Sequence, residues 1–173
     1  MLDDETIQQI RDIRYRVDQL WTEEHMDCSS IVARYSGSAQ QAPIPDSVVT
    51  IVDFQIVTYD PDSLVTTGAA WHFTAVVAGY YAVEAMILFT AADTWADVEW
   101  GSIYLYKNGA VFSSLDRKDN YSSASTVFME LGGGDLVYLA NGDTLDIRLF
   151  QNSGAALDLD SNPIYNHVAI WKV

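Results

Sequence analysis

From Val48 onward, short apolar runs with the composition of β-strands alternate with turn signals, and no helical pattern intervenes. The runs, rich in Val, Ile, Thr and aromatic residues, cover residues 48–52, 70–77, 80–91, 101–106, 125–131, 136–139, 144–151 and 167–173. The turn signals between them are residues 60–62 (DPD), 78–79 (AG), 108–109 (NG), 132–134 (GGG), 141–143 (NGD) and 152–154 (NSG). Strand-like runs at this spacing predict an all-β antiparallel sandwich, of which the jelly roll is one form. The Asn-Gly pair at 108–109 is typical of a type I′ hairpin turn.

The first 26 residues carry a different periodicity, that of an amphipathic helix. Ile10, Ile13, Val17 and Leu20 are three, four and three residues apart, which places them on one face of a helix. Acidic residues beginning at Asp3 favour a helix start. We expect this stripe to pack on the chain's own domain, to form a short coiled coil, or to anchor the chain in a groove of another protein. Because it is too short to hold an oligomer together alone, the domain behind it must supply most of the association.

Both periodicities disappear between residues 27 and 47, where Ser, Gly, Gln and Pro are frequent. This composition predicts an extended linker, with a short strand near Ile31 to Tyr35 as an alternative within it, followed by a domain over residues 48–173. Cys28 is the only cysteine of the chain, so no intrachain disulfide can form. We expect its thiol to be buried and inert, or to meet its copies near the axis of an oligomer.

The charge balance is strongly acidic, with 24 acidic against 9 basic residues and a net charge of -15. Binding to phosphate backbones or anionic lipids needs clustered Lys and Arg, and the sequence has no such cluster, so we expect neither nucleic acid nor a membrane as a partner. The longest apolar runs are too short for a transmembrane helix. The opening residues 1–5 (MLDDE) resemble no signal peptide, so we expect synthesis in the cytoplasm without export by the usual route.

Four blocks, in order, resemble the C1q/tumour-necrosis-factor-like family: AGYYAV at 78–83, SIYLYKNG at 102–109, DLVYLANGDTL at 135–145 and NHVAIWKV at 166–173. The third block is the most specific, whereas Val83 stands where the family usually has an aromatic residue and the last block lacks the usual Phe-Ser-Gly core. The resemblance covers residues 48–173 and implies a jelly roll that assembles as a homotrimer around its aromatic-rich face. It makes Tyr80, Tyr81, Tyr104, Tyr106, Tyr138 and Trp171 candidates for core or trimer-face aromatics.

Sites for catalysis or a structural metal find little support. His25, His72 and His167 are scattered, and no zinc-ligand spacing or nucleophile elbow surrounds them. The glycine triplet at 132–134 lacks a following Lys and helix, so we interpret it as a loop rather than a phosphate cradle. We therefore expect a non-enzymatic protein with no catalytic residue and no cofactor.

Two polar segments are candidate binding sites. Trp95, Asp97 and Trp100 lie in a predicted loop, where exposed tryptophans would suit a host-surface glycan or protein; the alternative is that both fold back onto the core. Asp158 and Asp160 alternate in a pattern that calcium accepts, although a solvated loop is the alternative interpretation and no bound metal is expected.

These observations lead to a functional hypothesis that rests partly on fold analogy. The chain is expected to be a bacteriophage virion structural protein: a trimeric head fibre, capsid decoration or tail appendage that displays its jelly roll for host attachment. Its N-terminal helix would bind a capsid or appendage protein. The alternative is a secreted or cell-surface C1q-like adhesin or ligand, which we would expect to carry an export signal and a stalk. An enzyme on a jelly-roll scaffold would need clustered metal-binding histidines.

Overall fold

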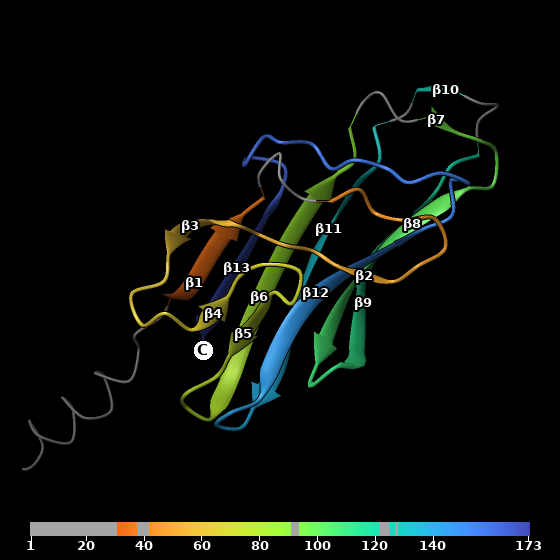
Figure 1. Ribbon diagram of the computed structural model, residues 1–173. Helices are drawn as coiled ribbons and strands as arrows, with labels where there is room; N and C mark the ends of the chain where they lie inside the picture. Colours follow the sequence, from red (N-terminus) through yellow and green to blue (C-terminus); the bar gives the residue numbers. More distant parts are fainter. Residues whose placement is uncertain (1–30, 38–41, 91–93, 122–124, 127) are drawn as a thin grey trace, which may run out of the picture. The chain divides into compact units, whose positions relative to one another are not determined.

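The computed structural model describes residues 31–37, 42–90, 94–121, 125–126 and 128–173 (Figure 1). The predicted helix over residues 1–26, with its apolar stripe of Ile10, Ile13, Val17 and Leu20, lies outside the described residues, and so does Cys28. Residues 31–173 form one compact unit, which we call the β domain. Its described ranges contain strands and turns but no helix, and hence no helix that could span a membrane.

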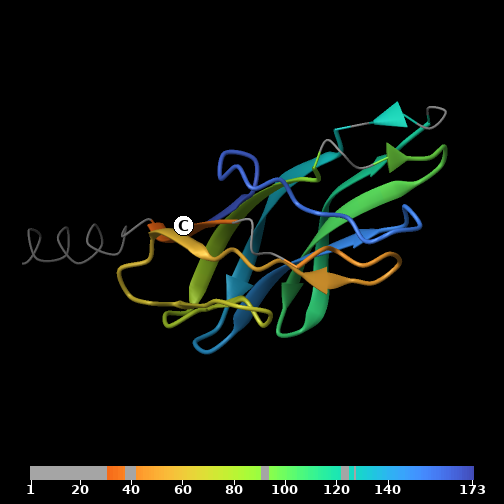
Figure 2. The same cartoon turned by 45° about the horizontal axis from the view of Figure 1, so that its top comes forward.

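The strands form two facing layers and pair only antiparallel in the described ranges (Figures 1 and 2). One sheet has the order β11-β6-β13-β1-β3, the other β4-β5-β12-β8-β9 with β2 paired to β12, and β10 and β7 form a small ladder of their own. The strands are β1 (Ile31–Ser36), β2 (Thr50–Ile51), β3 (Ile56–Tyr59), β4 (Val65–Thr66), β5 (His72–Thr74), β6 (Gly79–Leu88), β7 (Thr94–Trp95), β8 (Trp100–Lys107), β9 (Ala110–Asp119), β10 (Ser125–Thr126), β11 (Glu130–Leu139), β12 (Thr144–Gln151) and β13 (His167–Lys172).

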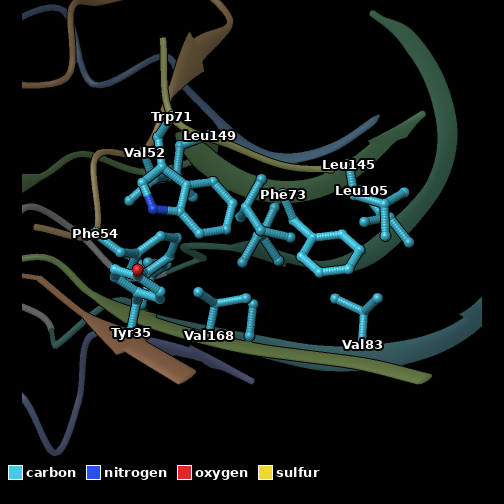
Figure 3. Close-up of a cluster of buried hydrophobic side chains, with 14 of the residues drawn as sticks. Tyr35, Val52, Phe54, Trp71, Phe73, Val83, Leu105, Leu145, Leu149 and Val168 are labelled. Atoms are coloured by element: carbon cyan, nitrogen blue, oxygen red, sulfur yellow. The ribbon is translucent and has the colours of Figure 1, made fainter. Parts of the chain in front are cut away.

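The core lies between the two layers because alternate side chains of each strand point inward. Val83 and Val168 approach from one sheet, and Phe73, Leu105 and Leu145 from the other (Figure 3). At one end of the core a fully buried indole extends this packing. Trp71 meets Phe54 edge-on, with ring centroids 5.3 Å apart, and Tyr35 at 6.2 Å.

The β domain begins earlier than the sequence indicated. Strand β1 lies inside the stretch 27–47 that we interpreted as a linker, at the place of the alternative short strand, and pairs with both β13 and β3. The physical reason is burial: Ala33 and Tyr35 point into the core, and the Tyr35 hydroxyl donates a 2.7 Å hydrogen bond to Asp60 Oδ2. Burial and this bond raise the pKa of Tyr35.

The glycine triplet is part of a strand and not the loop that its composition suggested. Strand β11 runs through it and pairs with β6 along its whole length. Strand β9 of the opposite sheet lies so close that a Cβ on Gly133 would be 2.5 Å from Leu115 O. Gly132 N donates a 3.2 Å hydrogen bond to Asp116 Oδ2 across the same edge. Gly133 therefore allows the two sheets to approach along one side of the sandwich, whereas a Cβ on Gly134 would be 2.6 Å from Val83 O of the paired strand β6.

The hairpin turn predicted at residues 108–109 is confirmed. Asn108 and Gly109 both have positive φ values, 51° and 75°, as a type I′ turn requires, and they join β8 to β9.

Candidate functional site

Two tyrosines stand side by side on the outer surface of the β11-β6-β13 sheet. Tyr80 and Tyr138 are cross-strand partners, and both point away from the core because they occupy outward positions of β6 and β11. Their rings meet edge-on with centroids 5.4 Å apart, and the side chains remain 55% and 51% exposed. The pair is therefore a rigid aromatic group presented to solvent.

Further apolar groups extend this surface. Leu136, which is 51% exposed, stands opposite Ala82, and the half-buried Trp171 lies on the other side of Ala82. A shallow hollow of about 410 Å³ lies beside them, with Gly133, Gly134 and Glu84 among its lining residues. We call this surface of Tyr80, Ala82, Leu136, Tyr138 and Trp171 the tyrosine face.

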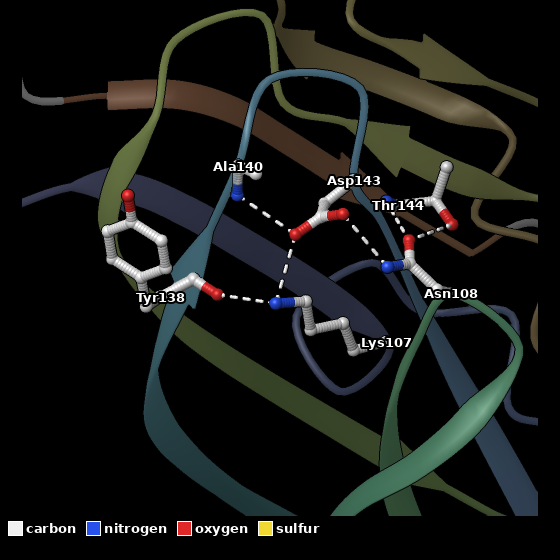
Figure 4. Close-up of polar contacts among 6 residues, drawn as sticks. All are labelled: Lys107, Asn108, Tyr138, Ala140, Asp143 and Thr144. Atoms are coloured by element: carbon white, nitrogen blue, oxygen red, sulfur yellow. Dashed lines mark hydrogen bonds and ion pairs between the residues drawn. The ribbon is translucent and has the colours of Figure 1, made fainter.

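A polar network fixes the end of β11 where Tyr138 lies (Figure 4). Lys107 Nζ donates to Tyr138 O at 2.8 Å and forms a 2.9 Å ion pair with Asp143. The Asp143 carboxylate also accepts from Asn108 Nδ2 and Ala140 N, at 2.9 Å each. The Asn108 bond, the Ala140 bond and Lys107, in that order, lower the pKa of Asp143 to about 2. The network joins the turn between β8 and β9 to the turn between β11 and β12.

The outer surface of the opposite sheet carries two arginines, each held in the same way. Arg148 contacts Asp146 through Nε at 2.5 Å and Nη2 at 3.2 Å, and its guanidinium lies 3.9 Å from the centre of the Tyr106 ring. The hydrogen bond to Asp146 raises the pKa of Arg148. We call the surface formed by Arg148, Tyr106, Arg117, Trp100 and Phe150 the arginine face.

Arg117 repeats this arrangement at the other end of the arginine face. It pairs with Asp119 at 2.7 Å and covers the Trp100 ring at 4.0 Å, and Trp100 stacks on Phe150 with centroids 4.6 Å apart. Neither arginine was among the site residues predicted from the sequence. The signal was nevertheless present, because residues two apart in a strand share a face and both arginines have an Asp at that spacing.

The three residues of the predicted ligand loop lie in different environments. Trp95 is 0% exposed and packs edge-on against Phe89 in the core. Asp97 is exposed, whereas Trp100 belongs to the arginine face. Buried Asn120 Nδ2 donates to Trp95 O at 2.7 Å and holds the start of the loop. The structure thus leaves Asp97 and part of Trp100, but not Trp95, within reach of a ligand.

The six candidate aromatics from the family resemblance lie in three different places. Tyr81 is in the core, where its hydroxyl donates to Val77 O at 2.7 Å. Tyr104 and Tyr106 lie on the outer side of β8, the second beneath Arg148. Tyr80, Tyr138 and Trp171 belong to the tyrosine face.

Asp158 and Asp160 lie on the long connection that precedes β13. Asp160 Oδ1 accepts a 2.7 Å hydrogen bond from Asn162 N, and Asp158 is exposed. Asn166, which was not among the residues predicted from the sequence, holds this connection to β6: its Oδ1 accepts from Leu88 N at 2.8 Å, and its Nδ2 donates to Asp160 O. Burial of an Asn is not visible in a sequence that also contains many exposed polar residues.

The two histidines in the described ranges lie apart and contact backbone carbonyls. His72 Nδ1 is 2.7 Å from Ala70 O, and His167 Nδ1 is 3.1 Å from Ile164 O. Among the residues that the structure describes, no three His, Cys, Asp or Glu side chains form a group that could hold a metal ion.

No protein-family model and no curated protein matches the sequence. Solved structures do match. Murine APRIL (crystal structure at pH 8.0) has a TM-score of 0.56 at 15% identity, covering 84% of this chain and 100% of that one. The globular domain of zebrafish complement 1qA protein has a TM-score of 0.56 at 16% identity, covering 82% and 97%. Eiger TNF from S. frugiperda has a TM-score of 0.55 at 15% identity, covering 83% and 92%.

The β domain has the C1q/TNF-like jelly-roll fold. This result confirms the fold class predicted from the sequence. At such identities the likeness concerns the fold alone, so the function has to be argued from the surfaces of this chain.

Proposed function

We propose that this chain is a non-enzymatic structural and binding protein that assembles as a homotrimer through its tyrosine face. The observation that carries the proposal is the exposed aromatic pair Tyr80 and Tyr138 with Leu136 beside it. A contiguous, rigid apolar surface of this kind favours burial in an interface, since aromatic residues are enriched at the centres of interfaces. The family resemblance supports three subunits, and closed symmetric rings are the common form of homo-oligomers.

Light scattering coupled to size exclusion tests the assembly. The unmodified chain is expected to have three times the mass of one chain, at micromolar concentration and neutral pH. Tyr80→Glu combined with Tyr138→Glu should give a monomer, because burying unpaired carboxylates costs several kcal/mol in each copy. Tyr121→Glu is the matched control, since Tyr121 is 79% exposed and lies outside the tyrosine face. A monomeric unmodified chain, or a double variant that still forms trimers, would contradict the proposal.

The absence of enzymatic activity is part of the same proposal. In the described ranges, the groups with shifted pKa values are tyrosines and arginines held by structural bonds and the carboxylate of Asp143 between two turns. None of them forms an acid–base pair in a cleft, which is the arrangement that general acid–base catalysis needs. Binding and display are therefore the roles that these surfaces favour.

At the level of biology, we propose a bacteriophage virion protein: a head fibre, capsid decoration or tail appendage, anchored by the N-terminal stripe and displaying the β domain for host attachment. The alternative, a secreted or cell-surface C1q-like adhesin, uses the same fold and the same trimer. Immunogold electron microscopy and mass spectrometry of purified particles separate the two. Label on particles is the expected result, and label only on the cell surface or in the medium would establish the alternative.

A further inference from the structure

A hollow of about 500 Å³ opens beside β2 and has no role in the proposed trimer. Val49, Ile51 and Ala69 form apolar parts of its lining, and Asp53 and Arg148 are its charged groups. Its volume lies within the range of about 300–1,000 Å³ that is usual for small-molecule sites. Arg148 places the hollow on the arginine face, on the opposite side of the sandwich from the tyrosine face.

The guanidinium of Arg148 is held in one orientation. Its two contacts with Asp146 and the stack on Tyr106 fix the plane of the guanidinium. A guanidinium carries five N–H donors, and Asp146 accepts only from Nε and Nη2 in the part of the chain that the structure describes. The remaining donors can therefore bind an acceptor at little further cost in side-chain entropy.

Asp53 positions the turn that contains Gly68 and Ala69. It is buried, and its carboxylate accepts from Gln55 Nε2 at 2.7 Å and from Gly68 N at 2.8 Å. Gly68 has a φ of 98°, a conformation that favours glycine, and precedes Ala69 of the lining. Asp53 thus fixes the turn that carries Ala69, which lines the hollow together with Arg148.

The charges indicate what the hollow can accept. Arg148 and Asp146 neutralise one another, and the chain has a net charge of -15, so an anion is disfavoured. The available donors require an oxygen acceptor, and the apolar lining suits C–H groups. A neutral ligand that combines hydroxyl oxygens with apolar C–H faces meets these conditions.

We propose that this hollow binds a neutral saccharide, with Arg148 donating hydrogen bonds to its oxygens and Val49, Ile51 and Ala69 contacting its C–H face. A second hollow of about 290 Å³, which shares Ile51 and includes Thr144 in its lining, gives room for an oligosaccharide. The inference rests on the proposed binding function and adds the class of ligand and the surface that holds it.

Titration of the trimer with lactose, maltotriose and diacetylchitobiose, followed by calorimetry and by the Nε–H resonance of Arg148, tests the proposal. At least one of these neutral saccharides should bind and shift that resonance. Arg148→Ala should weaken binding by about tenfold or more, the usual effect of losing a hydrogen bond from a charged donor. Arg117→Ala should change affinity by less than about twofold, because Arg117 has the same kind of Asp and aromatic partners but does not line the hollow.

A second variant keeps the test decisive if Arg148→Ala does not fold. Ala69→Phe fills the hollow from an exposed position and should abolish binding without disturbing the core. Three outcomes would overturn the inference: no binding of any of the three saccharides, unchanged affinity in folded variants, or tighter binding of sialyllactose than of lactose. If the protein is a trimer but binds none of the three saccharides, only the saccharide proposal fails. If the protein is a monomer that binds lactose, only the proposed trimer fails.

Discussion

At the scale of single residues, close approach between backbones decides what β11 can carry. Gly132 and Gly133 are neighbours in the same strand, yet their surroundings differ. A Cβ on Gly133 would be 2.5 Å from Leu115 O, whereas a Cβ on Gly132 would be 3.4 Å from its nearest neighbour, Ala85 O. The first distance requires movement of strand β9, and the second is an ordinary contact.

We therefore expect Gly133→Ala to lower the free energy of unfolding by about 1–3 kcal/mol, the usual cost of forcing an extra group into a packed region. Gly132→Ala should be neutral or slightly stabilising, because the alanine reduces the entropy of the unfolded chain. Denaturant unfolding of both variants at equal protein concentration checks the difference. Equal stabilities would contradict the close packing of β9 on β11.

Asp143 predicts a dependence of stability on pH. Its pKa in the folded chain, about 2, lies below the ordinary value of 3.8, so the folded state releases the proton more readily than the unfolded chain does. The stability contributed by the ionised carboxylate is complete above the ordinary value and is lost as the pH falls from there through about 2. Urea unfolding at a series of pH values should show that Asp143→Asn is less stable than the unmodified chain at neutral pH. The free energies of unfolding of the two proteins should become equal as the pH falls to about 2. A difference that does not change with pH would refute this account.

At the scale of elements, the alternation of apolar and polar residues predicted the strands that cover the core. It did not predict strands whose residues lack this alternation. The runs at 80–91, 144–151 and 167–173 correspond to β6, β12 and β13, each with regularly buried positions. Strand β9 was assigned to no run because its residues are mostly exposed or half-buried and carry charges, so they show no apolar alternation. The glycines of β11 were interpreted as a turn because the close contacts of Gly133 with Leu115 and of Gly134 with Val83 come from other strands and are not visible in the sequence.

Surface sites were less predictable than strands, since the same residue type can lie inside or outside. Trp95 and Trp100 are five positions apart in one acidic segment, yet one is in the core and the other beneath Arg117. The Tyr80–Tyr138 pair depends on the register between β6 and β11, which a single sequence does not contain.

The connection before β13 depends on Asn166, and we expect Asn166→Ala to destabilise the β domain by about 2 kcal/mol or more. The substitution leaves buried Leu88 N without its acceptor, and unsatisfied buried groups cost about 1–3 kcal/mol each. Hydrogen exchange at Leu88 should accelerate at the same time. Asn162→Ala is the control: its side chain is exposed and accepts from Ile164 N at 3.0 Å, so its loss should cost less than about 1 kcal/mol.

The same connection carries the calcium candidates. Because Asp160 Oδ1 already accepts from Asn162 N, and Thr90 N donates to Asp158 O at 3.0 Å, protein groups fix this loop. We expect EDTA to shift the melting temperature by no more than a few degrees. A large decrease that calcium reverses, and that Asp158→Ala with Asp160→Ala abolishes, would instead establish a metal site.

At the scale of the whole β domain, the tyrosine face and the arginine face lie on opposite outer sides of the sandwich. One surface can therefore be buried between subunits while the other remains accessible to a ligand. This separation is why substitutions at Tyr138 and at Arg148 are expected to affect assembly and saccharide binding independently.

Anchoring is the third role that we propose, and we propose it for the predicted stripe of Ile10, Ile13, Val17 and Leu20. This stripe is too short to be stable alone and too apolar to remain in water, so a protein surface must bury it. On the virion proposal that surface belongs to a capsid or appendage protein. Ile13→Asp combined with Val17→Asp should therefore abolish incorporation into particles, because each buried, unpaired carboxylate costs several kcal/mol.

The purified double variant should still form a trimer that melts cooperatively, and so should a chain that lacks residues 1–26, because we propose that the β domain supplies the association. Particle incorporation is measured by quantitative mass spectrometry, and melting is measured in solution. Together they distinguish the three interpretations of the stripe: packing on its own domain, a short coiled coil, or an anchor in another protein. Normal incorporation of the double variant would show that the stripe is not the anchor. Unfolding of the β domain in the double variant would show that the stripe packs on its own domain, because only then does a charge in the stripe reduce the stability of residues 31–173.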